Sequence, residues 1–166
     1  MDGVLLFVRL VVGLAIAAHG VQKLFGWFGG YGLAGTAGFF EQLGFRPGRV
    51  FAFFAGLAET GGGLLTALGL FGALGPATIV MVMLVAIFSV HVKKGFFITN
   101  GGWELNAIYI AAAVEIAYAG SGAYSLDRAF GLAVLSSAPA ASLAIVAAIV
   151  LAALNLLARR SPAATA

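Results

Sequence analysis

Four ionisable side chains stand within or beside apolar stretches of the sequence. His19, Glu59, His91 and Glu104 lie near the ends of hydrophobic segments that are expected to meet at one membrane face. Placing an acid or a base in or beside hydrocarbon costs about 2.5–3.5 kcal/mol on insertion scales. Since 9% of the residues are charged, a chain that places ionisable groups at such positions is expected to use them. The pattern predicts a polar site inside a helical membrane protein.

The spacing of three polar residues indicates how this site is built. His19, Gln22 and Lys23 are spaced i, i+3 and i+4, so they project from one helical stripe. The alternative is a histidine bonded to a nearby carbonyl and a lysine whose ammonium reaches the interface. Glu59 lies about nine residues into its segment, so it must be protonated or paired with Lys23 or a histidine. Its alternative role is to tie two helices together.

The two histidines suggest proton and hydrogen-bond chemistry. His19 and His91 would contact the carbonyls of a quinone-like ligand, and Glu59 and Glu104 would relay protons. Two histidines on separate helices are also the ligands that a haem or a metal would need. We disfavour both because the chain offers a single pair. Glu104 could instead be a helix-start acid stabilised by the helix dipole. With Glu115 eleven residues later in the sequence, it is expected to share an interior stripe.

The composition defines the class of protein. Hydrophobic residues make up 62% of the 166 residues, against about 45–50% in soluble domains, so lipid must solvate most of the chain. The net charge of +3 comes from dispersed basic residues, which argues against a nucleic-acid partner. Cysteine is absent, and no flavin or dinucleotide motif is present, so a bound cofactor or a partner must carry any electrons.

Turn residues divide the chain into five apolar segments, each expected to be a transmembrane helix. They cover residues 4–25, 50–74, 76–92, 103–119 and 132–158. The first segment resembles a signal peptide, but Asp2 rather than lysines precedes it, and it continues past the cleavage site that such a peptide would have. We therefore expect it to be retained as a helix. The glycine-rich stretch 27–45 predicts a short helix that lies in the interface or re-enters the bundle, with aromatic residues at headgroup level; a flexible loop is the alternative.

The distribution of basic residues predicts the orientation. One side of the membrane would hold Lys23, Arg46, Arg49, Lys93, Lys94, Arg159 and Arg160. The other side would hold Arg9 and Arg128. The positive-inside rule makes the first side cytoplasmic, with the N-terminus outside and the C-terminus inside. At the outer end we expect Arg9 to form a salt bridge with Asp127, unless the two are independent interfacial charges.

Five separated motifs resemble those of the DoxX family of small bacterial membrane proteins. They are residues 19–26 (HGVQKLFG), residues 58–62 (AETGG), His91 with residues 95–97 (GFF), residues 101–105 (GGWEL) and residues 124–127 (YSLD). The resemblance runs from about residue 4 to residue 128. It implies a four-helix membrane core in the bacterial cytoplasmic membrane. It also implies membership in an oxidoreductase system linked to quinones, thiosulfate oxidation or oxidative-stress defence.

Together these observations predict an all-α integral membrane protein. It would have a four-helix transmembrane bundle at 1–128 and, at 129–166, an additional C-terminal transmembrane helix with a short basic tail. The functional hypothesis is a membrane oxidoreductase component that binds a quinone or similar redox lipid, with His19, Glu59 and His91 as catalytic residues. Lys23, Gln22 and Glu104 would bind the cofactor. The alternative is a non-enzymatic subunit that recruits a soluble oxidoreductase or carries a small hydrophobic molecule. A homo-oligomer is compatible with either hypothesis, and the sequence does not identify the electron donor.

Overall fold

The protein is built from helices alone in the part of the chain that the structure describes. The computed structural model describes residues 1–160, apart from the side chains of residues 133 and 134. The long helices are α1 (Asp2–Phe25), α3 (Gly48–Leu68), α4 (Leu74–Ala86), α5 (Glu104–Ala119) and α7 (Ala138–Leu157). The short elements are η1 (Trp27–Gly29), α2 (Gly32–Gln42), η2 (Ile87–His91), η3 (Val92–Lys94), η4 (Ile98–Asn100), α6 (Leu126–Ala129) and η5 (Ala133–Ser136). The predicted all-α class is confirmed. The end of the predicted basic tail, residues 161–166, lies outside the described residues.

Four helical segments within residues 1–160 are long and apolar enough to cross a membrane. They are Asp2–Phe25, Gly48–Leu68, Leu74–Lys94 and Ala138–Leu157. The third continues α4 through η2 and η3. The predicted span at 103–119 forms α5, whose 16 residues extend about 24 Å. This is less than the hydrocarbon thickness of about 30 Å, so α5 does not meet the length expected of a span.

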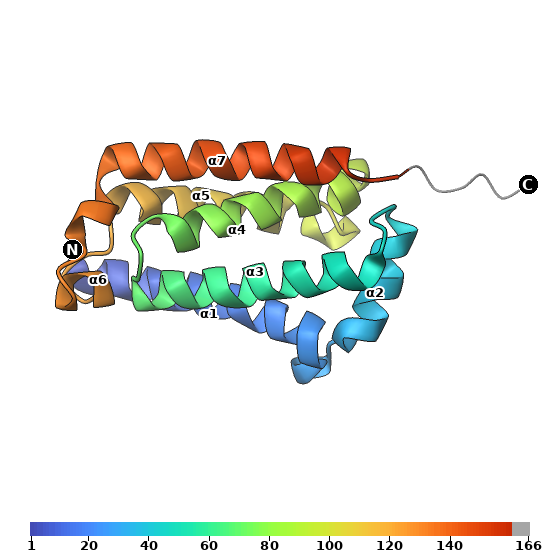
Figure 1. The fold of residues 1–166 in the computed structure, drawn as a ribbon, viewed down its shortest axis with the longest axis horizontal. Helices are drawn as coiled ribbons and strands as arrows, with labels where there is room; N and C mark the ends of the chain where they lie inside the picture. Colours follow the sequence, from blue (N-terminus) through green and yellow to red (C-terminus); the bar gives the residue numbers. More distant parts are fainter. Residues whose placement is uncertain (161–166) are drawn as a thin grey trace, which may run out of the picture.

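Successive long helices alternate in direction and form two layers (Figure 1). One layer contains α1 and α3, and the other contains α4, α5 and α7. The helix α2 lies across one end of the bundle and packs against α3 and α1. The N-terminus and α6 lie at the opposite end. With 11 residues, α2 extends about 16 Å, which is too short to cross the bilayer.

Glycines set the close contact between α1 and α3. A Cβ atom on Gly13 would collide with the backbone of Gly63, and a Cβ on Gly20 would collide with Thr60 and Gly56. Small residues at such crossings let two membrane helices approach closely enough for extensive van der Waals contact. The result is that Lys23 on α1 and Glu59 on α3 are brought to the same side of the bundle.

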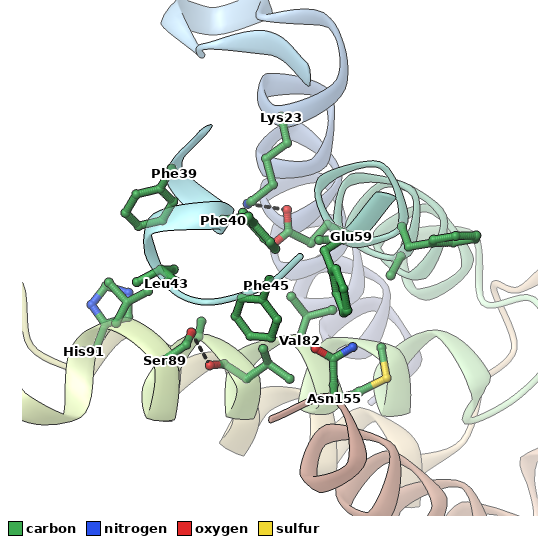
Figure 2. Close-up of a pocket in the computed structure, with 18 residues that line it drawn as sticks. Lys23, Phe39, Phe40, Leu43, Phe45, Glu59, Val82, Ser89, His91 and Asn155 are labelled. Atoms are coloured by element: carbon green, nitrogen blue, oxygen red, sulfur yellow. Dashed lines mark hydrogen bonds and ion pairs between the residues drawn. The ribbon is translucent and has the colours of Figure 1, made fainter. Parts of the chain in front are cut away.

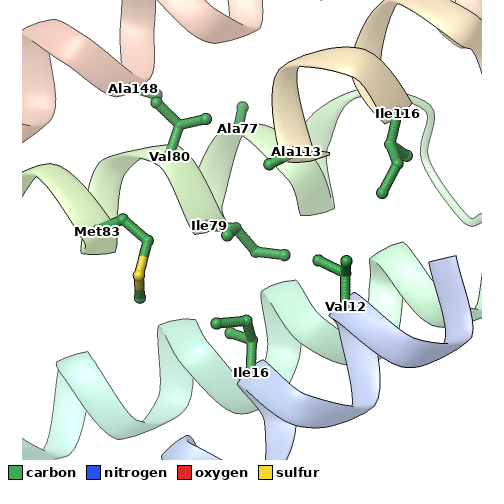
Figure 3. Packing of buried hydrophobic residues seen from close by; sticks show 9 residues of the cluster. All are labelled: Val12, Ile16, Ala77, Ile79, Val80, Met83, Ala113, Ile116 and Ala148. Carbon is green, nitrogen blue, oxygen red and sulfur yellow. The ribbon is translucent and has the colours of Figure 1, made fainter. Parts of the chain in front are cut away.

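Branched aliphatic side chains fill the space between the two layers (Figure 3). Ile16 and Val12 of α1 pack against α4 and α5. Ile16 and Ile79 are fully or almost fully buried. The cluster consists of Val12, Ile16, Ala77, Ile79, Val80, Met83, Ala113, Ile116 and Ala148. Since Ala148 belongs to α7, that helix is packed into the main core.

Arg9 and Asp127 hold the N-terminal end of the bundle together without a direct ion pair. Arg9 donates hydrogen bonds to the backbone carbonyls of Ser121 and Ala67 and, at 2.7 Å, to that of Tyr124. Asp127 accepts from the Ser121 hydroxyl at 2.6 Å and from the backbone N–H groups of Phe71 and Gly72. Among residues 1–160 the one salt bridge is elsewhere. The predicted Arg9–Asp127 salt bridge is therefore wrong: both side chains are fully buried and are linked through Ser121.

Candidate functional site

A cavity of about 390 Å³ lies at the end of the bundle that α2 covers (Figure 2). Its walls come from α2 and the turn after it, from α3, from α4 with η2, and from the last turns of α7. Phenylalanines form much of the wall: Phe39, Phe40, Phe45, Phe51 and Phe54. The polar side chains that line it are Lys23, Glu59, Ser89, His91 and Asn155. We refer to it as the aromatic cavity.

Lys23 and Glu59 form an ion pair on the α1–α3 side of the aromatic cavity (Figure 2). The Lys23 Nζ atom lies 2.5 Å from Glu59 Oε2, and the side chains are 28% and 5% exposed. Of the alternatives predicted for Glu59, a bound proton or pairing with Lys23 or a histidine, the structure shows pairing with Lys23. A buried carboxylate needs such a partner because hydrocarbon solvates an isolated charge poorly.

A change in helix type at the end of α4 carries two polar residues to the aromatic cavity. Residues Ile87–His91 form a π-helical turn, and such turns are frequent at functional sites. Ser89 donates to the Val85 carbonyl at 2.6 Å. The His91 Nδ1 atom lies 2.7 Å from the Gly101 carbonyl oxygen, which can only accept. In the neutral ring Nδ1 therefore carries the hydrogen, and Nε2 is the nitrogen that accepts a proton.

His19 and Gln22 line a second hollow of about 680 Å³ beside the aromatic cavity. Lys23, Phe39 and Phe40 line both hollows and so form the wall between them. Gln22 Nε2 donates to the Phe28 carbonyl at 3.1 Å. Its Oε1 atom is left to accept from His19 Nδ1, also at 3.1 Å. The predicted stripe is present, but His19 is exposed and faces a different hollow from His91.

The two remaining acids do not join this site. Glu104 begins α5, as expected, and its Oε2 atom accepts from the Ile98 backbone N–H at 2.9 Å. It is not among the described residues that line either hollow. Glu115 is exposed, so the expectation of a shared interior stripe with Glu104 is wrong. Lys23, Glu59 and His91 thus come together, whereas His19 and Glu104 do not join them.

Sequence reasoning missed the aromatic wall and Asn155. The five phenylalanines lie within residues 39–54, and this density was a usable signal in a chain with 14 phenylalanines. Phe45 is 1% exposed and its ring centroid lies 5.6 Å from that of Phe40 and 5.3 Å from that of Phe51. Asn155 carries an amide near the end of an otherwise apolar segment. Within residues 1–160, no group of three or more His, Asp or Glu side chains could hold a metal ion.

The fold and the cavity define a multi-pass helical membrane protein with a polar site near one end of the bundle. The family profile of DoxX matches residues 4–92, which is more than half of the 166-residue chain. The chain therefore belongs to the DoxX family. No similar protein was found among the curated proteins or the solved structures. The matched segment contains Lys23, Glu59 and His91, whereas Asn155 lies beyond it.

Proposed function

We propose that the protein is the membrane component of an oxidoreductase system and that the aromatic cavity binds a quinone or a similar redox lipid. The observation that supports this most directly is the Lys23–Glu59 ion pair within a phenylalanine-walled cavity that His91 also lines. Flat apolar walls suit a ring, and a few convergent polar groups fix its orientation. The volume of about 390 Å³ lies within the range of about 300–1,000 Å³ typical of small-molecule sites.

The exposure of the cavity wall favours a ligand that arrives from lipid. Phe39 and Phe54 both line the cavity, and they are 46% and 61% exposed. Their outer surfaces face the surroundings of the bundle, where the bilayer would lie. A hydrophobic tail could remain in lipid while the ring enters the cavity.

The polar residues would take the following roles. Reduction of a quinone to a quinol adds electrons and protons at its ring oxygens. Lys23 would donate a hydrogen bond to one oxygen, and Glu59 would exchange the proton. His91 Nε2 would exchange a proton at the ring, with Nδ1 fixed by Gly101. A soluble or membrane-bound oxidoreductase partner would supply or remove the electrons.

The second hollow, which His19 and Gln22 line, suggests how protons would reach the site from water. His19 lies one helical turn from Lys23 on the same stripe. Gln22 fixes the orientation of the His19 ring by a hydrogen bond. From this position His19 would pass protons between water and the Lys23–Glu59 pair. Glu104 would act by fixing the turn before α5 and not by contacting the ligand.

A second candidate function remains for the same cavity. Its walls are predominantly apolar, so it would also suit a subunit that carries a small hydrophobic molecule without redox chemistry. Such a carrier would bind hydrocarbons and quinones alike, and replacing Glu59 would leave binding largely intact. An oxidoreductase component would discriminate between them.

Bound quinone is the measurement that tests the proposed function. The protein and its Glu59→Gln variant are purified into lipid nanodiscs, and the extracted quinones are quantified against empty discs. We expect quinone to copurify with the wild-type protein and to be lost from Glu59→Gln. Glu115→Gln is the matched control because it removes an exposed acid outside the cavity. Equal quinone in wild-type, Glu59→Gln and empty discs would overturn the proposal.

A further inference from the structure

The last turns of α7 complete the aromatic cavity from the side away from α1. The helix α7 packs on α4 and α5, and Asn155 near its end lines the cavity. Figure 2 shows the Asn155 amide on the other side of the Phe45 ring from Lys23 and Glu59. The segment matched by the DoxX profile ends at residue 92, so this wall comes from outside it.

The Asn155 amide has unused hydrogen-bonding capacity. Among residues 1–160, the side chains of α7 and its C-terminal end that form hydrogen bonds are Ser142 and Arg159, and Asn155 is not one of them. Asn155 is half-buried in a helix whose neighbouring residues are Ala and Leu. An amide that faces an apolar cavity without a partner is unfavourable. A ligand oxygen in the cavity would supply the missing partner.

Contacts after α7 hold the helix end that carries this amide. The Arg159 Nε atom donates to the Leu43 carbonyl at 2.9 Å, and its guanidinium lies 5.4 Å from the Phe45 ring centroid. The Arg160 backbone N–H donates to the Gly44 carbonyl at 2.8 Å. The end of α7 is therefore fastened to residues 43–45, of which Leu43 and Phe45 also line the cavity. A binding group held in this way loses little freedom when it meets a ligand.

We infer that Asn155 is a ligand-recognition residue and that the ligand is a ring with oxygens on opposite sides. The Asn155 amide N–H donates to one oxygen, while the opposite oxygen faces the Lys23–Glu59 pair. This inference rests on the proposed function, because it assigns a new contact within the same cavity. An amide donor at one end and an ammonium donor at the other select a dioxygenated ring over a hydrocarbon of the same shape.

Duroquinone and durene are matched probes, since they differ in the two ring oxygens and share the methylated ring. Binding of each is titrated to wild-type protein, Asn155→Leu and Ser142→Ala in nanodiscs. Leucine has the same number and branching of side-chain heavy atoms as asparagine. Ser142 shares a hydrogen bond with Tyr118 outside the cavity. We expect Asn155→Leu to weaken duroquinone binding about five- to tenfold, as for one lost hydrogen bond, and to leave durene binding unchanged. Ser142→Ala should change neither.

The outcomes separate the inference from the proposed function. Unchanged durene binding shows that the Asn155→Leu variant keeps its cavity. If wild-type protein prefers duroquinone and Asn155→Leu has the same preference, Asn155 is not the recognition residue, and the proposed function stands. If wild-type protein does not bind duroquinone, the proposed function is wrong and the inference falls with it.

Discussion

The Lys23 ammonium lies 2.5 Å from the Glu59 carboxylate, and this ion pair joins α1 to α3 at the edge of the aromatic cavity. Glu59 is 5% exposed, so removing its partner leaves a charge with little solvation. The pair is thus both a structural link and the polar centre of the proposed site. Substitutions of one or both residues separate these two roles.

Replacing one member of this pair should destabilise the bundle more than replacing both. We expect Lys23→Met to lower the free energy of unfolding by about 2–3 kcal/mol, below the range for fully buried pairs because Lys23 is 28% exposed. The double variant Lys23→Met/Glu59→Leu should recover most of that loss and still fail to bind quinone. Denaturation in mild detergent, combined with a quinone-binding assay, measures both effects. A double variant less stable than Lys23→Met would show that the pair is not interchangeable with apolar packing.

The Arg9–Asp127 arrangement should not tolerate a charge swap. Arg9 binds backbone carbonyls and Asp127 binds backbone N–H groups. After the exchange, the carboxylate at position 9 would face carbonyl oxygens and the guanidinium at position 127 would face N–H groups, and both contacts are repulsive. We expect Arg9→Asp/Asp127→Arg to be at least as unstable as either single variant. Arg9→Met should cost about 3–5 kcal/mol, because several charge-assisted hydrogen bonds are lost together. Thermal melting monitored by circular dichroism tests this. A double variant more stable than both single variants would indicate that Arg9 and Asp127 form a direct salt bridge.

Adding a methyl group at the α1–α3 crossing should be costly. Gly63→Ala would place a Cβ against the backbone of Gly13 and Ala17, and we expect a loss of about 1–3 kcal/mol from overpacking. Gly61→Ala is the matched control, because nothing lies within 4 Å of its added Cβ. A helix generally gains about 0.5–1 kcal/mol from such a change. Equal melting temperatures for the two variants would contradict the close approach of α1 and α3.

Arg159 should hold the turn between α2 and α3 through its side chain. Arg159→Ala removes the hydrogen bond to the Leu43 carbonyl and the contact with Phe45. We expect amide hydrogen exchange in residues 43–45 to become about five- to tenfold faster, as for the loss of one to two weak interactions. Arg160→Ala is the control because Arg160 contributes its backbone N–H to Gly44. Similar exchange in both variants would mean that the Arg159 side chain does not hold this turn.

Single cysteines should report the orientation that we propose from the basic residues. The chain has no cysteine, so an introduced one is labelled alone. Tyr31 and Tyr124 are 88% and 62% exposed, near opposite ends of the bundle. We expect an impermeant maleimide added to intact bacteria to label Tyr124→Cys, and to label Tyr31→Cys only after lysis. The reverse pattern would invert the topology and place the aromatic cavity near the outer face.

The sequence by itself determined that lipid surrounds this protein, and it determined where most of the helices lie. A chain so rich in apolar residues must bury its backbone polar groups in helices when lipid surrounds it. Glycine, asparagine and proline residues marked most boundaries. The segment expected at 50–74 was an exception, because α3 ends at Leu68 and a separate turn precedes α4. The high cost of a charge in hydrocarbon also limited Glu59 to a bound proton or a basic partner, with Lys23 and a histidine as the candidates, and the structure shows Lys23.

The tertiary structure alone decided which polar groups share a cavity. The order of helices places His19 and His91 at the same end of the bundle, but α2 crosses that end and Phe39 and Phe40 divide it into two hollows. Contacts between segments far apart in the chain, such as Arg159 with Leu43, depend on helix packing and leave no periodic pattern. Arg9 and Asp127 show the same limit: opposite charges suggest an ion pair, yet each binds backbone groups in the turns between helices. Local spacing sets which face of a helix a residue occupies, whereas packing between helices sets what that face meets.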